Sequence, residues 1–444
     1  MQRPFDWLRE QLAAIAEHLP TIPVVPGADS SAQIHSFLAE HFELSHQAPL
    51  DQACELTASL MRGWPTHAGH PQNFASMYGD VHPTGLIGDS LASAWDAHSS
   101  LQTSSPLAQE IEAFVVAFLC HRIGFKPQQS NGFFTADAAQ AKQLALVSAL
   151  AQCFPGFAES GVRACEGRPL IYHSQANADG LAELLTTTGL GRESLRLVRC
   201  AANGQMDIKT LRRMIIEDAR NDHTPFMVIA SAGTDAGAID PIKGLAALAR
   251  VQGMWLHVDA SGGGMGLLCN ALKGDFDGLR FADSVAIDTR TAFAVPGPGG
   301  IFLCRHAQPM QFLPQATSAG LAIKAFLALA HLGADGYSDL LQHQLNMASQ
   351  LEVLLVQKNW RVLRPSLLPV LLVQDPGLNH ENEQSSRYLH WIDTLREKHN
   401  TLLSLVTHGD GQACIRVCIS NFATNLACLQ ELAENLEEIR QISE

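Results

Sequence analysis

The chain is predicted to be an α/β protein with a mainly parallel sheet. From residue 168 onward, short apolar runs alternate with helical patterns, and this alternation is typical of parallel strands covered by helices on both faces. The chain is also long enough for two or more buried cores, because it has 444 residues of which 46% are hydrophobic. Strands are expected at 170–173, 195–199, 226–231, 255–259, 284–288 and 301–305, with helices at 207–219 and 240–252.

Two flanking regions complete the predicted architecture. The N-terminal region is expected to be helical with one break near Pro20, because Leu8, Leu12 and Ile15 recur at helical spacing. After residue 335, a long helix, three strands and a closing helix predict a smaller α+β domain. We therefore expect an N-terminal helical segment over 1–65, a large domain over 66–325 and a small domain over 326–444. The remaining elements are helices at 107–123, 139–153 and 424–440 and strands at 368–373, 402–407 and 413–420.

Composition excludes several classes of function. The formal net charge is −14, from 30 basic and 44 acidic side chains, whereas nucleic-acid binding needs a basic surface. No apolar run reaches membrane-spanning length, and the N-terminus lacks the apolar core of a signal peptide. The ten cysteines form no CxxC pair, which favours reduced thiols over disulfides or zinc. The sequence thus predicts a cytoplasmic protein that binds neither nucleic acid nor membrane.

Asp259 is the first candidate functional residue. It ends the predicted strand 255–259 and is followed by Ser261 and two glycines. The carboxyl ends of parallel strands form the ligand-binding edge of open α/β sheets. A strand-end aspartate alone is a weak signal, since it commonly caps a turn or helix. Its context adds weight: an apolar run over 224–231 leads to Gly233-Thr234, and the runs 282–287 and 299–303 follow.

The order and spacing of these runs resemble the group II pyridoxal-phosphate-dependent amino-acid decarboxylases, which include glutamate, aromatic-amino-acid and diaminobutyrate decarboxylases. The resemblance extends from about His70 to Asn421. It implies the fold-type I, aspartate-aminotransferase-like architecture and an obligate homodimer whose N-terminal segments intertwine. It also implies that Asp259 matches the carboxylate that keeps the cofactor's pyridine nitrogen protonated.

The chain departs from the family at the lysine that binds the cofactor. The family has Asn/Asp-Pro-His-Lys where this chain has Asp288, Thr289, Arg290 and Thr291. The lysine supplies the amine of the Schiff base, and a threonine has no amine. Arg290 cannot serve as the nucleophile because its guanidinium is permanently protonated.

The family's phosphate loop is also altered. A Thr-Ser-Gly-Gly-Ser/Thr-Glu-Ala-Asn motif corresponds here to residues 135–142, in which Thr135 remains but Ala138 and Ala139 replace the second glycine and the hydroxyl. A phosphate cradle needs glycine for close backbone approach and a helix N-terminus. The helix N-terminus is retained, whereas Asp137 would place a negative charge beside the phosphate.

Three further differences affect the same cleft. The histidine that stacks on the cofactor aligns with Ala178, and the loop from Gly233 to Gly237 is one residue short around Thr234. The segment 306–323 is much shorter than in the family and has no tyrosine, so the family's mobile catalytic loop is interpreted as deleted. The remnant of the cofactor cleft is expected to comprise Thr135, Ala138, Ala139, Ala178, Thr234, Asp259, Ser261, Asp288, Arg290 and Thr291.

Other polar residues have simpler interpretations. Each of the eight lysines, Lys142 included, is expected to be a solvated surface residue. Arg290 is expected to pair with Asp259 or Asp288, since buried charges are normally paired. The alternative is that Arg290 binds a new carboxylate or phosphate ligand. No metal site is expected, because the loop histidines near His67 and His70 lack ligand spacing.

These observations favour a decarboxylase-family homologue that has lost pyridoxal chemistry. We expect no cofactor, or pyridoxal phosphate bound non-covalently at most, and no catalytic residues. The chain would act as a binding, scaffold or regulatory partner, as a homodimer or paired with an intact paralogue. The alternative is an active L-amino-acid decarboxylase with non-standard cofactor binding. A third hypothesis, new chemistry in the old cleft, has no nucleophile–base pair to support it.

Overall fold

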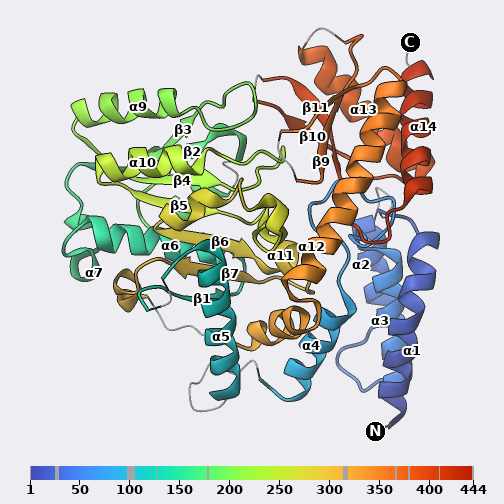
Figure 1. Cartoon of the computed structure of the whole chain (residues 1–444). Coiled ribbons are helices and arrows are strands. Elements are labelled where there is room, and N and C mark those ends of the chain that lie inside the picture. Colours follow the sequence, from blue (N-terminus) through green and yellow to red (C-terminus); the bar gives the residue numbers. More distant parts are fainter. Residues whose placement is uncertain are drawn as a thin grey trace.

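The computed structural model shows a large α/β unit, a smaller α+β unit and a group of N-terminal helices (Figure 1). It describes residues 2–25, 30–97, 106–126, 128–177, 180–313, 319–365, 368–378, 381–409 and 411–442. Within these residues, no helix is both long and apolar enough to span a membrane.

The central element is a seven-stranded sheet in the order β1-β7-β6-β5-β4-β2-β3. The five strands β3, β2, β4, β5 and β6 pair in parallel with their neighbours, whereas β7 pairs antiparallel with both β6 and β1. The sheet is therefore mainly parallel, as predicted. Its strands are β1 (Asn131–Thr135), β2 (Arg168–Ser174), β3 (Leu195–Val198), β4 (His223–Ser231), β5 (Trp255–Asp259), β6 (Ser284–Asp288) and β7 (Gly300–Cys304).

Helices cover both faces of this sheet because its strands are apolar on both sides. Ile171 and Ile229 pack with α6 (Ala138–Cys153) on one face. Their neighbours Tyr172 and Val228 pack on the opposite face, as the two-residue side-chain period of a strand requires. The opposite face is covered by α5 (Pro106–Ile123), α9 (Ile208–Arg220), α10 (Ile242–Gln252) and the first half of α12 (Ala319–Gln357). Figure 1 shows α9 and α10 side by side.

The C-terminal unit has its own sheet and core. Its four strands are ordered β10-β11-β9-β8 and are all antiparallel. Trp391, Tyr388 and Leu351 are fully buried between this sheet and its helices. The elements are β8 (Arg361–Leu363), β9 (Val370–Gln374), β10 (Ser404–Thr407), β11 (Ala413–Cys418), α13 (Glu381–His399) and α14 (Leu426–Ile442).

The N-terminal helices lie along one side of the molecule, below the C-terminal unit in Figure 1. They are α1 (Gln2–His18), α2 (Ser30–His41) and α3 (Leu50–Gly63), and α4 (Pro83–Ala94) follows beside α12. The chain from α3 to α4 ties the units together, because Phe74 N–H donates to Leu402 O and Phe74 O accepts from Cys418 N–H. The predicted domain limits at 65 and 325 stay predictions; α12 runs across the second of them.

Seven of the helices and strands in the described residues were absent from the predicted set: β1, β8, α4, α13 and three short helices. These short elements around the sheet are α7 (Phe157–Ser160), α8 (Leu181–Thr187) and α11 (Thr289–Phe293). The last of these begins where β6 ends, beside the acid of β5, and it forms part of the candidate site.

Candidate functional site

The candidate site lies at the carboxyl ends of β5 and β6. These strands end in Asp259 and Asp288. Asp259 lies two residues after His257 and Asp288 two residues after Ala286, so each carboxylate is on the same face of the sheet as that residue, the face covered by α6. The N-termini of α6 and α11 converge on the same edge. Topology therefore brings together segments near residues 135, 259 and 290, as the family resemblance implied.

Asp259 forms an ion pair with Lys142, with Nζ and Oδ2 3.2 Å apart. Only 5% of the Asp259 side chain is exposed, against 27% for Lys142. Burial acts to raise the pKa of Asp259, but the Lys142 ammonium and the hydrogen bond from Ser261 N–H outweigh burial and hold it at about 2. The prediction that Lys142 is a solvated surface lysine is wrong, because its position on the inner side of α6 aims it at the sheet.

Two buried histidines lie on the same face of the sheet. His173 and His257 flank Ile229 in register on neighbouring strands, and burial lowers the pKa of each imidazole to about 4. His257 Nδ1 lies 2.9 Å from the hydroxyl of Ser284, while its Nε2 is buried without a hydrogen-bond partner among the described residues. Both imidazoles are therefore neutral near pH 7 and leave Lys142 as the cation beside Asp259.

The N-terminus of α6 is capped by its own side chains. The carboxylate of Asp137 accepts a hydrogen bond from Gln140 N–H at 2.7 Å, and Gln140 Oε1 accepts one from Ala136 N–H at 2.7 Å. The arrangement resembles a capping box, except that Gln140 binds the N–H of the residue before the N-cap Asp137. The hydroxyl of buried Thr135 donates to Asp137 O. Ala138 and Ala139 form the first turn of the helix. The hydroxyl of Thr135 and the N–H groups of Ala136 and Gln140 are thus already bonded within the chain.

Thr291 and Asp288 are held in a compact turn. Asp288 Oδ1 caps α11 by accepting from Arg290 N–H at 2.8 Å and Thr291 N–H at 3.0 Å. The Thr291 hydroxyl donates to Ser261 O, which joins this turn to the segment after β5. Asp288 is mostly buried, and burial raises its pKa. The side chains of Thr291 and Asp288 therefore serve local structure.

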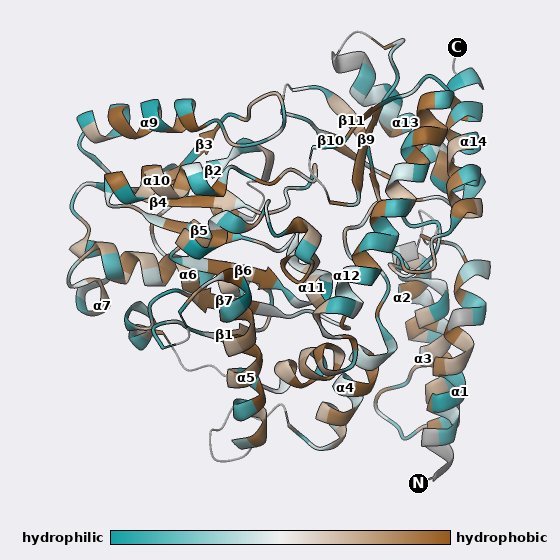
Figure 2. Ribbon diagram, viewed as in Figure 1, coloured by the Kyte–Doolittle hydropathy of each residue, from teal (hydrophilic) through white to brown (hydrophobic). Residues whose placement is uncertain are grey.

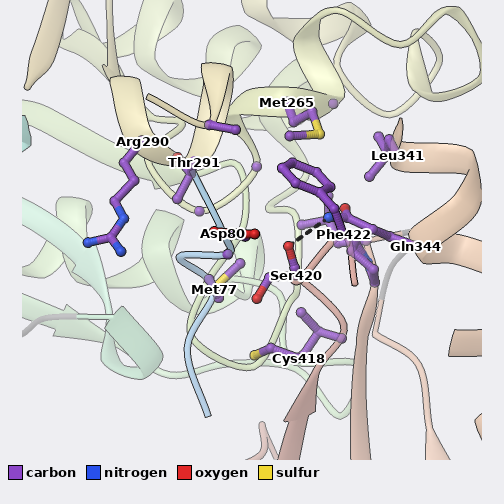
Figure 3. Close-up of a pocket in the computed structure, with 18 residues that line it drawn as sticks. Met77, Asp80, Met265, Arg290, Thr291, Leu341, Gln344, Cys418, Ser420 and Phe422 are labelled. Atoms are coloured by element: carbon purple, nitrogen blue, oxygen red, sulfur yellow. Dashed lines mark hydrogen bonds between the residues drawn. The ribbon is translucent and has the colours of Figure 1, made fainter. Parts of the chain in front are cut away.

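Arg290 borders a small cavity of about 50 Å³ between the large and the C-terminal unit, room for only a few water molecules. Figure 3 shows Arg290 directed away from Gln344 and Phe422, with Gln344 hydrogen-bonded to Ser420 O. The guanidinium lies 5.5 Å from the ring centroid of Tyr78.

The predicted ion pair between Arg290 and Asp259 or Asp288 is wrong. Among the described residues no such pair forms, and Arg290 Nε is buried without a hydrogen-bond partner. The reason is that Lys142 neutralises Asp259, whereas Asp288 accepts backbone N–H groups at the start of α11. Arg290 is left facing the aromatic ring of Tyr78.

The other predicted site residues have structural partners or lie outside the described residues. Thr234 is fully buried, and its hydroxyl accepts from Ala238 N–H at 3.0 Å, which closes the short loop. Ser261 N–H donates to Asp259 Oδ1. Ala178 lies outside the described residues. In the shortened segment, the described part forms the 3₁₀ helix Gln308–Phe312 before α12 begins at Ala319.

Two further observations concern lysine and histidine. Lys324 is another lysine that does not match the surface prediction: it is 2% exposed, donates to Pro296 O at 2.6 Å and lies 3.4 Å from Asp89. Among the described residues, no cluster of three metal-ligating side chains occurs. His67 lies near Arg62 O, and His70 accepts a hydrogen bond from Gln72 N–H.

With this geometry in hand, comparison with known proteins identifies the family. The model of the pyridoxal-dependent decarboxylase conserved domain matches residues 43–311, more than half of the chain. The chain belongs to the pyridoxal-dependent decarboxylase family. Two solved structures have a similar fold. One is the glutamate decarboxylase domain of the diaminobutyrate-pyruvate transaminase and L-2,4-diaminobutyrate decarboxylase of Vibrio parahaemolyticus, with a TM-score of 0.86, 21% identity and coverage of 98% of this chain and 94% of that one. The other is Catharanthus roseus tryptophan decarboxylase, with a TM-score of 0.87, 16% identity and coverage of 100% and 97%.

Two curated relatives align with parts of this chain. The L-2,4-diaminobutyrate decarboxylase of Rhizobium meliloti is 30% identical over 252 residues, which are 56% of this chain and 48% of that protein. The aromatic-L-amino-acid decarboxylase of Bacillus atrophaeus is 24% identical over 370 residues, 77% of this chain and 73% of that protein. The matched segment thus spans about half of the first relative's length.

The family uses pyridoxal phosphate, and the residues that the resemblance assigns to this cofactor do not fit it. A Schiff base needs an amine, but Thr291 offers a hydroxyl that is bonded to Ser261 O. The ring nitrogen would need the carboxylate of Asp259, which Lys142 already neutralises. The phosphate would meet the carboxylate of Asp137 at the helix N-terminus. We therefore derive no catalytic step through the cofactor.

Sequence reasoning missed Lys142, His173 and His257 as members of this site. One signal was present: Lys142 occupies the position of the asparagine in the family's phosphate motif. It follows the first residue of α6 by four positions and therefore lies on the same side of the helix as that residue. The two histidines carried no such signal, because each lies within a short buried strand and nothing in the local sequence places it beside Asp259.

Proposed function

We propose that this member of the decarboxylase family no longer performs pyridoxal chemistry and acts as a binding or regulatory subunit. The observation that carries the proposal is Thr291. Its hydroxyl is tied to Ser261 O and its N–H to Asp288, so the position aligned with the family's lysine is built into the turn. A hydroxyl cannot exchange an aldehyde between enzyme and substrate as an amine does.

The absorption spectrum of the purified protein with added pyridoxal phosphate tests the proposal. We expect no Schiff-base band and no label retained after borohydride reduction and removal of free cofactor. The matched positive control is an active family member treated identically. A borohydride-stable adduct on a single lysine of the native protein, together with carbon dioxide release from an amino acid, would overturn the proposal.

A second candidate function rests on one specific observation. Lys142 brings a primary amine into the cleft, 3.2 Å from Asp259. An active L-amino-acid decarboxylase with non-standard cofactor binding would use this amine in place of the missing one. Peptide mapping after borohydride reduction separates the two functions, because the second predicts the label on Lys142 and the first predicts no label.

Association of two chains is part of the proposal. Apolar side chains on α1 and α3 are solvent-exposed in the single chain: Leu8 (45%), Leu12 (43%), Ile15 (50%) and Met61 (63%). A cavity of about 540 Å³ lies between these helices, and Figure 2 shows hydrophobic residues along both. Exposed apolar surface of this kind commonly marks a protein interface. We propose a homodimer formed through these helices.

The remaining parts of the proposal concern partners and setting. An intact paralogue would offer the same helices, so a heterodimer is the alternative to the homodimer, and co-expression followed by affinity purification distinguishes them. Arg290, which has no ion-pair partner among the described residues, supports a small carboxylate or phosphate ligand at the cavity of Figure 3. A reduced, cytoplasmic setting agrees with ten free thiols.

A further inference from the structure

We infer that the ammonium of Lys142, on helix α6, takes the place of the cofactor's positively charged ring beside Asp259. It neutralises this carboxylate without a cofactor and excludes pyridoxal phosphate from this position. The inference deepens the proposed function and rests on it in one respect, namely that the cleft holds no Schiff-base cofactor. It names a residue that would prevent the cofactor from binding, whereas a missing lysine at position 291 would prevent only its covalent attachment.

The geometry supports an internal pair. Lys142 lies just over one turn into α6, on the side that packs on the sheet, since its neighbours Ala141 and Ala145 are fully buried there. Its Nζ reaches Asp259 Oδ2 at 3.2 Å, and the other carboxylate oxygen accepts Ser261 N–H at 3.0 Å. Both oxygens of Asp259 therefore have a partner within the chain.

The electrostatics require a cation at this place. A buried carboxylate is costly unless it is paired and hydrogen-bonded, and Asp259 is only 4% exposed. The titratable groups near it on the same face of the sheet are His257 on β5, His173 on β2 and Asp288 at the end of β6. Both imidazoles are neutral near pH 7, and Asp288 is a second acid, so none of the three supplies a positive charge. Among the described residues, Lys142 is the cation that forms an ion pair with Asp259. Without it, this acid would need an external cation, such as a protonated ring nitrogen.

The neighbouring helix end makes the opposite substitution. Asp137 places its carboxylate on the N–H of Gln140, where an anion would otherwise bind the helix N-terminus. A cofactor with a cationic ring and an anionic phosphate would thus meet Lys142 and Asp137, each carrying the same sign of charge as the cofactor group it faces. Repulsion at both ends explains why the cleft would reject the cofactor rather than merely fail to hold it.

The stability experiment compares Lys142→Met with two controls in protein without added cofactor. Lys142→Arg retains the charge, and Lys209→Met removes a charge from an exposed lysine of α9. Leaving a buried acid unpaired is strongly destabilising, so we expect the Tm of Lys142→Met to fall by about 3 °C or more. The controls should change little. Adding Asp259→Asn to Lys142→Met should restore part of the loss, because the unpaired charge is then absent.

The binding experiment uses pyridoxine 5′-phosphate, which lacks the aldehyde and therefore reports non-covalent fit. We expect no rise in Tm with the native protein or Lys142→Arg, and a saturable rise with the double variant Asp137→Ser/Lys142→Met, in which serine still caps α6. Equal Tm values for Lys142→Met and Lys209→Met, or equal binding by the native and double-variant proteins, would overturn the inference. These readouts do not involve a Schiff base, so the borohydride experiment decides the proposed function separately.

Discussion

Acidification should destabilise this protein through the two histidines buried beneath α6. His173 and His257 are both at most 3% exposed, and burial lowers the pKa of each from 6.5 to about 4. In the unfolded chain the same imidazoles titrate near their ordinary value. Between these two pKa values the unfolded state binds more protons than the folded state, so the free energy of unfolding falls as the pH falls.

The size of the effect follows from these pKa values. Between pH 7 and pH 5, each histidine reduces the free energy of unfolding by roughly 2 kcal/mol. Asp240 opposes them, because burial raises its pKa to about 6, and its earlier protonation in the folded state adds about 1 kcal/mol over the same interval. Asp259, with a pKa of about 2, loses its stabilising effect only below its unfolded pKa. The two histidines and Asp240 together therefore produce a loss of roughly 2–3 kcal/mol.

Chemical denaturation monitored by tryptophan fluorescence at pH 5, 6 and 7 measures this loss. His173→Asn and His257→Gln should each shift the absolute stability and should each remove roughly 2 kcal/mol of the change between pH 7 and pH 5, which is most of the net pH dependence. Asp240→Asn is the opposite control, since removal of the opposing acid should steepen the dependence. If native protein and both histidine variants show the same slope between pH 5 and 7, the two imidazoles are not neutral and buried, and the assignment of Lys142 as the cation beside Asp259 loses its support.

Three further outcomes are expected. Thr291→Lys alone should release no carbon dioxide from amino acids supplied with pyridoxal phosphate, because Lys142 still occupies Asp259; measurable release in a ¹⁴C-carboxyl assay would contradict this. Lys324→Met should lower the free energy of unfolding by roughly 1–2 kcal/mol, because it removes the hydrogen bond to Pro296 O and the partly exposed ion pair with Asp89. Lys273→Met, at an exposed lysine, should leave stability unchanged in the same denaturation assay, and equal losses would refute a special role for Lys324. Leu12→Glu should convert a dimer to monomer in size-exclusion chromatography with light scattering, whereas an unchanged mass would place the interface elsewhere.

Sequence patterns predicted the strands that build the large sheet because those strands are apolar on both faces and separated by periodic helices. The strand β1 was missed: it pairs antiparallel with β7, whose residues lie more than 160 positions away, and its five residues have no local alternation that distinguishes them from a loop. The helix α13 was missed for a different reason. Its residues are largely polar, and it has few large apolar side chains, such as the buried Trp391 and Tyr388, to mark an apolar face.

The candidate site was predicted in composition and not in its interactions. The motif around Thr291 and the acid at Asp259 were assigned through the family resemblance, which rests on the order and spacing of the apolar strands that they follow. The partner of Asp259 could not be assigned in this way, since Lys142 is 117 positions earlier in the chain and meets it only when α6 packs on the sheet. The expected partner, Arg290, has the right charge and is closer in sequence, yet it leaves Asp259 to Lys142 and lies beside Tyr78.

The sequence by itself determined the fold class and the family, and it predicts that Thr291 stands at the family's lysine position, because these depend on local periodicity and on the order of motifs along one chain. The tertiary structure decided which charges meet. Packing of α6 on β5 brings Lys142 to Asp259, places His173 and His257 on either side of Ile229, and leaves Arg290 without a direct ion pair among the described residues. Ion pairing acts over a few ångströms between residues that are distant in sequence, so only the folded chain shows a cleft whose acid is neutralised by its own lysine.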